Sequence, residues 1–341
     1  MCRPIAIVLF LFCISCNSRK EKSDTQAFYS WSAFYQPTDS SAKLPSSTFN
    51  HLYLHYYDVT WSDEYHIPLP KPSFRQQFVD STFYGGNAFT PVIHIENTVL
   101  EKLPMDSMVP LAAKMNSKLE LLSSQIHQQS AVTPDDEIQF DCNWTPDTKD
   151  KYFILLLQFK QLQPKKELSA TVNLYAFKER ATMGVPPVNR VMLQCYDIGR
   201  SNDTSSNNAN LDSTILAGYF KGGVYPLPLD LAFPVGGWMV HYREGKKLGY
   251  PYLFEFFKEY KSLFEAKDQE QFTLLKDTSY LGTDYKVNDI LRREAVQPAV
   301  LASAIKYITG KIKYRRIAFW YWNPPVTYQY RDIIRQTFAA H

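Results

Sequence analysis

The chain has 341 residues, with 15% aromatic residues and a formal net charge of +3 that comes from 37 Lys and Arg against 34 Asp and Glu. This near balance argues against nucleic-acid binding, and a total of only 13 Gly argues against glycine-rich phosphate loops. Of the five Cys, only Cys142 and Cys195 follow the first 16 residues, and these two do not form a CxxC pair, which excludes a disulfide scaffold and a zinc ribbon.

Residues 1–16 are predicted to be an export signal, because a basic residue precedes a short apolar run that is too short to span a membrane. The run ends at "CISC", where Ser15 precedes Cys16. This resembles the lipobox of bacterial lipoproteins, although Cys13 stands where that pattern prefers Leu. The resemblance implies cleavage before Cys16, a diacylglycerol on its sulfur and a protein anchored to a membrane of the bacterial envelope. An ordinary signal peptide cut nearby is the alternative. Residues 17–27 are expected to be a polar tether.

Eight strand-like runs follow, the first of which begins one residue before the predicted folded domain, residues 28–341. They are short, apolar on both faces and rich in aromatic and β-branched residues, which is typical of strands buried on both sides of a parallel sheet. In chain order they are residues 27–35, 51–61, 89–97, 137–145, 167–177, 190–199, 228–242 and 315–323.

Amphipathic helical stretches lie between many of these runs, for example residues 105–129, 145–163 and 298–311. This alternation predicts an α/β fold, a single-domain (β/α)₈ TIM barrel. An insertion at about 268–294, between strands seven and eight, is expected to form a hairpin or a small subdomain. A doubly wound open sheet is the alternative fold, but no G-x-G-x-x-G follows the first run.

In a barrel of this kind the chemistry takes place at the carboxyl ends of the strands. All six Trp lie in or just beyond a predicted strand. A mouth that combines Trp and Tyr with acids and amides suits a sugar, because pyranose faces stack on aromatic rings while polar groups bind the hydroxyls. Alternatively, these aromatic residues simply fill the barrel and its helix layer. The candidate substrate-binding residues are Trp31, Asp58, His94, Asn143, Tyr175, Tyr196, Asp197, Trp238, Trp320 and Trp322.

The fourth strand-like run carries polar residues at alternate positions. If Asp141 points into the barrel, then Gln139 and Asn143 do so too, and Cys142 faces the helices. The same rule, applied to the sixth strand, gives the inward-facing residues Gln194 and Tyr196.

The fourth strand also resembles that of the family-18 glycoside hydrolases, the chitinase-like barrels, which carry D-x-x-D-x-D-x-E there. Asp136, Gln139, Asp141 and Asn143 fall in that register. The resemblance covers roughly residues 28–323 and implies a glycosidase-like barrel that acts on or binds a glycan.

Two further motifs support the resemblance. The family's sixth strand commonly carries M-x-Y-D, and this chain has Met192, Tyr196 and Asp197, with two more residues between Met and Tyr than the pattern has. The family's eighth strand ends in a Trp at the floor of the sugar site, a position that Trp320 or Trp322 could match.

The chain departs from the family at the proton donor. The resemblance places that residue at Asn143, which has no proton to give, although general-acid help is commonly worth about 10²–10⁴-fold in rate. Hydrolysis therefore needs another acid. Glu96, at the end of the third strand, is the candidate acid, with Asp141 as its partner carboxylate. Asp58 and Asp197 are further candidates.

These features lead to three hypotheses. The first is an envelope-anchored protein that binds an oligosaccharide or cell-wall glycan and hydrolyses it through Glu96 and Asp141. The second is a non-catalytic glycan-binding lipoprotein on a degenerate barrel, which Asn143 favours. The third is a metal-dependent hydrolase with ligands from His55, His94 and Asp141. The first two need no cofactor and no metal.

Overall fold

The computed structural model describes residues 26–31, 49–72, 88–198, 211, 213–220, 224–249, 261–267, 271–280, 283–322 and 327–340. The predicted export signal with Cys16, most of the tether and most of the polar loop after residue 199 lie outside these residues. Within the described part, every helix is too short or too polar to cross a membrane.

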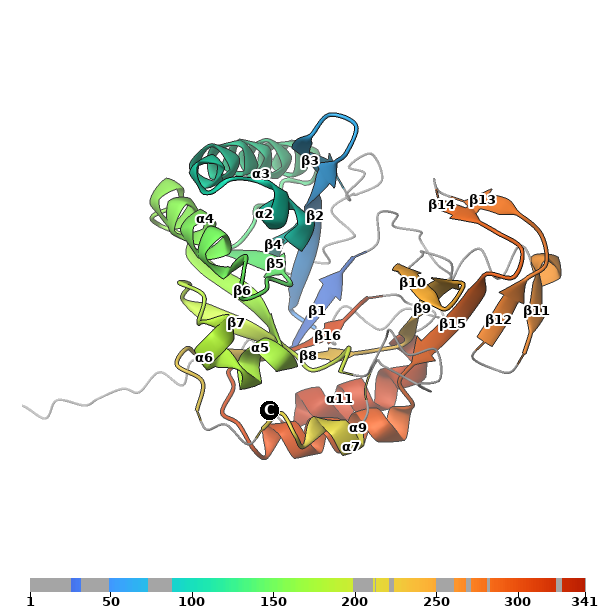
Figure 1. The fold of residues 1–341 in the computed structure, drawn as a ribbon. Coiled ribbons are helices and arrows are strands. Elements are labelled where there is room, and N and C mark those ends of the chain that lie inside the picture. Colours follow the sequence, from blue (N-terminus) through green and yellow to red (C-terminus); the bar gives the residue numbers. More distant parts are fainter. Residues whose placement is uncertain are drawn as a thin grey trace, which may run out of the picture.

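Eight parallel strands form a closed barrel, because β1 pairs with β16 on one side and with β2 on the other (Figure 1). This confirms the predicted (β/α)₈ fold. A ninth strand, β3 (Ile67–Pro72), pairs antiparallel with the end of β2. The barrel strands are β1 (Gln26–Ser30), β2 (His51–Ser62), β4 (Ala88–Ile95), β5 (Glu137–Cys142), β6 (Glu167–Asn173), β7 (Arg190–Gln194), β8 (Leu229–Pro234) and β16 (Ile317–Trp320).

Helices surround the barrel, and their buried residues recur at helical spacing, as the sequence pattern indicates. α3 and α4 pack side by side on one flank, and α9 and α11 lie together on another (Figure 1). The α-helices are α2 (Asn97–Lys102), α3 (Met108–Ser130), α4 (Lys149–Leu162), α5 (Leu174–Lys178), α6 (Arg180–Met183), α7 (Ser213–Leu216), α9 (Pro298–Thr309) and α11 (Arg331–Ala339). The 3₁₀ turns are η4 (Met105–Ser107), η5 (Lys261–Leu263) and η6 (Tyr328–Tyr330).

An antiparallel insert between β8 and β16 stands beside the barrel (Figure 1). Its five-stranded sheet has the order β10-β9-β15-β12-β11, and β13 and β14 form a separate hairpin. The strands are β9 (Gly237–Arg243), β10 (Lys246–Gly249), β11 (Phe264–Ala266), β12 (Gln271–Leu274), β13 (Thr278–Tyr280), β14 (Thr283–Tyr285) and β15 (Ile290–Ala295).

The insert begins earlier than the expected residue 268. The run 228–242, predicted as one strand, is two strands that belong to different sheets. The chain turns between them at Gly236, which has φ +80°, a backbone conformation that only glycine adopts without strain. Next to it, Gly237 lies so close to β15 that a Cβ would stand 1.9 Å from the carbonyl oxygen of Glu294.

The side chains of β5 alternate as the sequence analysis predicts. Ile138, Phe140 and Cys142 belong to the apolar core between the barrel and the helices. Gln139 and Asp141 instead bond to side chains of other strands inside the barrel. A small apolar cluster lies about midway along the barrel interior, with polar groups towards both ends of the strands.

Candidate functional site

Asp141 is the centre of a hydrogen-bond network at the carboxyl end of the barrel. Its Oδ1 accepts hydrogen bonds from Thr171 Oγ1 at 2.5 Å and Gln194 Nε2 at 3.1 Å, and its Oδ2 accepts one from His94 Nδ1 at 2.9 Å. Burial would raise the pKa of Asp141, but the hydrogen bond and charge of His94, with the bond from Thr171, hold it below its usual range. Asp141 is therefore an ionised acceptor with donors from three neighbouring strands.

His94 is fixed by this carboxylate. Since an ionised carboxylate has no proton to donate, the hydrogen of this bond sits on His94 Nδ1. Burial would lower the pKa of His94, yet the hydrogen bond and charge of Asp141, with the charges of Asp58 and Glu96, raise it above its usual range. The side chain is 26% exposed, so it reaches the mouth of the barrel.

A first aromatic group lies next to His94. The indole of Trp31 stacks on the ring of His55, with 3.9 Å between the centroids, and meets the ring of His94 edge to face at 6.2 Å. His55 is buried, and its Nε2 lies 3.0 Å from Oδ1 of Asp58. The sequence predicted Trp31 and Asp58 at the mouth, whereas His55 entered only as a metal ligand.

A second aromatic group forms where β7, β16 and the insert meet. Tyr196 stacks on Trp320 at 5.4 Å, and Trp238 meets both rings edge to face at 6.3 and 5.5 Å. Tyr321 packs against Trp320 at 5.0 Å. Trp238 is the second residue of β9, so the insert supplies part of this second aromatic group.

Other predicted residues lie at the rim. Asn143 is exposed, and its Oδ1 accepts a hydrogen bond from Asn173 Nδ2 at 3.1 Å. Glu96 is also exposed and stands just before α2. Tyr175 on α5 is 54% exposed, and Asp197 is exposed with φ +54°. The structure shows these four near strand ends, but none takes part in the hydrogen bonds to Asp141.

Trp322 is placed differently from the prediction. Its ring packs against Phe28 and Phe49, each at 5.0 Å, in the core between the barrel and the helices. Trp61 and Trp144 also pack in that core. The alternation of strand side chains stops at the end of β16, so the expected match of Trp322 to the mouth does not hold.

Thr171 is the member of the network that the sequence analysis missed. It lies on the face of β6 that also carries Ser169 and Asn173, which bond to Gln139 on β5 and to Asn143 just after β5, respectively. This run of alternate polar residues is the signal that could have identified it.

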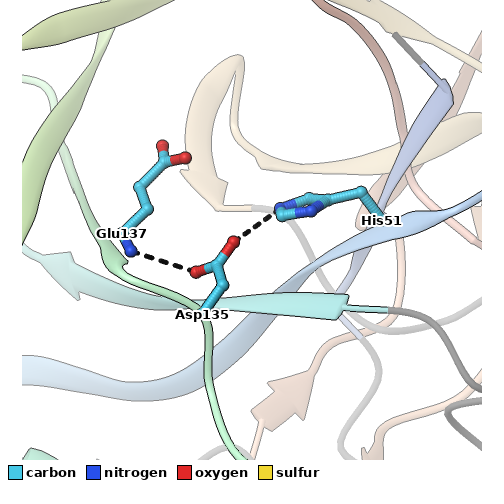
Figure 2. Close-up of side chains that lie close together, drawn as sticks. All are labelled: His51, Asp135 and Glu137. Carbon is cyan, nitrogen blue, oxygen red and sulfur yellow. Dashed lines mark hydrogen bonds and ion pairs between the residues drawn. The ribbon is translucent and has the colours of Figure 1, made fainter. Parts of the chain in front are cut away.

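The opposite end of the barrel holds a second polar cluster, shown in Figure 2. One ligand atom from each of His51, Asp135 and Glu137 lies within 4.8 Å of the other two. Among the described residues, this is the group whose spacing could suit a metal ion. His51 Nε2 lies 2.9 Å from Thr90 Oγ1 and 3.6 Å from Asp135 Oδ2.

Cations of the chain already occupy this end. Glu137 Oε2 accepts a hydrogen bond from Arg316 Nη1 at 3.0 Å and lies 3.6 Å from Arg190 Nη2. Burial and these two guanidinium groups lower the pKa of His51 to about 3. The cluster is a buried polar network closed by arginine, a poor setting for a further cation.

The predicted metal set of His55, His94 and Asp141 does not converge either. Each imidazole pairs with its own carboxylate, His55 with Asp58 and His94 with Asp141, and the two rings lie 6.5 Å apart. Ligands of one zinc ion would all lie about 2.0–2.2 Å from it. The contacts of these residues therefore fit hydrogen bonding better than metal binding.

Comparison with known proteins agrees with the fold. No family model and no curated protein matches the sequence. Among solved structures, the GH18 chitinase ChiB of Flavobacterium johnsoniae has a TM-score of 0.50 at 11% identity, over 93% of this chain and 95% of that one. A chitinase from Bacteroides thetaiotaomicron gives 0.49 at 9% identity, over 92% and 96%. The spore cortex-lytic enzyme SleL of Bacillus cereus gives 0.46 at 13%, over 91% and 74%. The fold is a (β/α)₈ barrel similar to that of the Flavobacterium johnsoniae chitinase.

Proposed function

We propose that this protein binds an oligosaccharide across the carboxyl ends of the barrel strands. The observation that supports this most directly is that two aromatic groups border one polar network. Trp31 meets His94 on one side of Asp141, and Tyr196 follows Gln194 on the other. Aromatic faces bind the apolar faces of sugar rings, and the network offers donors and acceptors for hydroxyl and amide groups.

The similar structures suggest which glycans to test, since one is a chitinase and another a spore cortex-lytic enzyme. Titration with chitin oligosaccharides and with soluble peptidoglycan fragments should give saturable heats in calorimetry and a change in tryptophan fluorescence. A monosaccharide series should bind more weakly, because a single ring buries less apolar surface against the aromatic side chains than an oligosaccharide does. If every glycan leaves both signals unchanged, the proposal is wrong.

A second candidate function, glycan binding without turnover, is favoured by Asn143. The resemblance to family-18 hydrolases puts their proton donor at this position, and here the side chain is an exposed amide. Asp141, the carboxylate that matches the family motif, is buried and fully engaged. Glu96 with Asp141 stays a candidate acid pair.

We also propose that Cys16 carries a lipid that anchors the protein to a membrane of the bacterial envelope. The support is the sequence "CISC" before a polar segment. In a bacterial host fed an alkyne fatty acid, Cys16→Ser should abolish labelling and move the protein from the membrane pellet to the soluble fraction. Cys2→Ser, a matched change in the same signal but outside the lipobox, should keep both. Labelling that survives Cys16→Ser would instead support an ordinary signal peptide.

A further inference from the structure

Turnover at this mouth would need a group that can give up a proton, and the family position holds Asn143. Asp141 cannot serve, because three donors and a lowered pKa keep it ionised. Tyr196 holds its proton too tightly, since burial and the charge of Asp141 raise its pKa well above 10. Asp58 lies against His55, and Glu96 is exposed at the start of α2.

We propose that His94 and Asp141 form a proton-transfer dyad, in which the His94 imidazole gives the glycosidic oxygen the proton that Asn143 cannot. This inference rests on the proposed glycan site and adds a chemical step to it. It assigns His94 as the acid and Asp141 as the residue that positions it.

The geometry fixes the imidazole for this role. Nδ1 donates to Asp141 Oδ2 at 2.9 Å, and Thr171 and Gln194 hold the same carboxylate through Oδ1. The carboxylate therefore sets both the ring orientation and the tautomer. Nε2 points from the far side of the ring, and none of the described side chains makes a hydrogen bond to it that would compete with a substrate. With 26% of the side chain exposed, a glycan lying along Trp31 can meet it.

The charged groups around His94 favour its protonated form. Asp141 faces it from β5, Asp58 and His55 from β2, and Glu96 follows on its own strand. The three carboxylates together raise the pKa of His94 despite its burial. The acid form thus persists to a higher pH than in free histidine, whose pKa is about 6.5. Activity should fall as pH rises through the His94 pKa.

The step balances with water as the only co-reactant. Nε2–H of the imidazolium protonates the glycosidic oxygen, and the bond from the anomeric carbon to that oxygen breaks with its electron pair going to the oxygen. The alcohol leaves, and water forms the new bond to the anomeric carbon. The proton that water loses passes to neutral Nε2, which restores the imidazolium beside ionised Asp141.

The test compares two leaving groups, because an activated one needs little protonation. His94→Gln should lower turnover of chitin oligosaccharides by about 10²–10⁴-fold. It should lower turnover of a 4-nitrophenyl chitobioside less than about tenfold, since 4-nitrophenolate leaves unaided. Asp141→Asn should shift the alkaline limb of the pH profile to lower pH. His127→Gln, an exposed histidine on α3, is the matched control and should keep full activity.

Each other outcome decides against the dyad. Equal losses on both substrates would make His94 a structural residue, and a loss in Glu96→Gln with His94→Gln active would assign the proton to Glu96. A protein that binds chitin oligosaccharides but turns over neither substrate is a glycan-binding protein, so the dyad fails and the proposed function stands. Absence of binding overturns the proposed function itself.

Discussion

Replacing Trp320 by Ala is expected to weaken oligosaccharide binding about 10- to 100-fold, equivalent to roughly 1.4–2.8 kcal/mol. Trp320 lies in the middle of the second aromatic group, where it stacks on Tyr196 and contacts Trp238 and Tyr321. Its loss removes a stacking surface and also frees its neighbours to move. Calorimetric titration with the best glycan from the binding screen measures the change.

Trp322→Ala is the matched control. Trp322 is only two residues away but packs against Phe28 and Phe49 in the outer core. That variant should lower the free energy of unfolding while the folded protein binds at the native affinity. Trp320→Phe should recover part of the lost affinity, because a ring remains. If Trp320→Ala and Trp322→Ala weaken binding equally, the second aromatic group does not contact the sugar.

The contrast between Trp320 and Trp322 shows where side-chain orientation can be predicted from the sequence and where it cannot. Within a strand, alternation is a local rule, so the sequence predicted the faces of Gln139, Asp141 and Cys142 correctly. Beyond the end of the strand this alternation no longer applies. The orientation of the Trp322 side chain depends on its contacts with Phe28 and Phe49, which lie near the other end of the chain.

The ends of strands within long apolar runs were also not predicted from the sequence. The run 167–177 looked like one strand, but Asn173 ends β6 and is the N-cap of α5, because its side chain accepts a hydrogen bond from the backbone N–H of Ala176. The run 228–242 looked continuous, but Gly236 turns the chain into the insert. Each break rests on one residue inside an otherwise apolar run, which a periodicity argument cannot detect.

The sequence predicted which residues lie near the carboxyl ends of the strands, but it did not predict the hydrogen bonds between them. His94 and Asp141 were both candidates, since each lies near the carboxyl end of a predicted strand. Their pairing depends on the register between β4 and β5, which puts these two residues directly side by side. Register between distant strands follows from packing of the whole barrel, so the role of His94 as the partner of Asp141 could not be read from spacing.

The barrel also depends on the polar layer at its other end, and Arg316→Leu should cost about 3–5 kcal/mol of unfolding free energy. Arg316 Nη1 donates to Tyr53 Oη at 2.6 Å and to Glu137 Oε2 at 3.0 Å, and Glu137 is 3% exposed. Without this guanidinium the buried carboxylate of Glu137 keeps, among the residues that the structure describes, only Arg190, at 3.6 Å, and the Ser169 hydroxyl. Urea unfolding followed by circular dichroism measures the loss. Arg335→Leu, on the exposed face of α11, is the control and should change stability by less than about 0.5 kcal/mol.

The pH dependence of this loss identifies its cause. Burial raises the pKa of Asp230 and of Asp135 to about 6, from ordinary values near 3.8, and the charge of Arg316 opposes the rise in both. A carboxyl with a raised folded-state pKa contributes stability that is complete below the unfolded pKa and is lost as pH rises through the folded one. Removing Arg316 raises both folded-state pKa values further, so the destabilisation of Arg316→Leu should be larger at pH 7.5 than at pH 5. A loss that is the same at both pH values would indicate that the charges of Asp230 and Asp135 take no part in it.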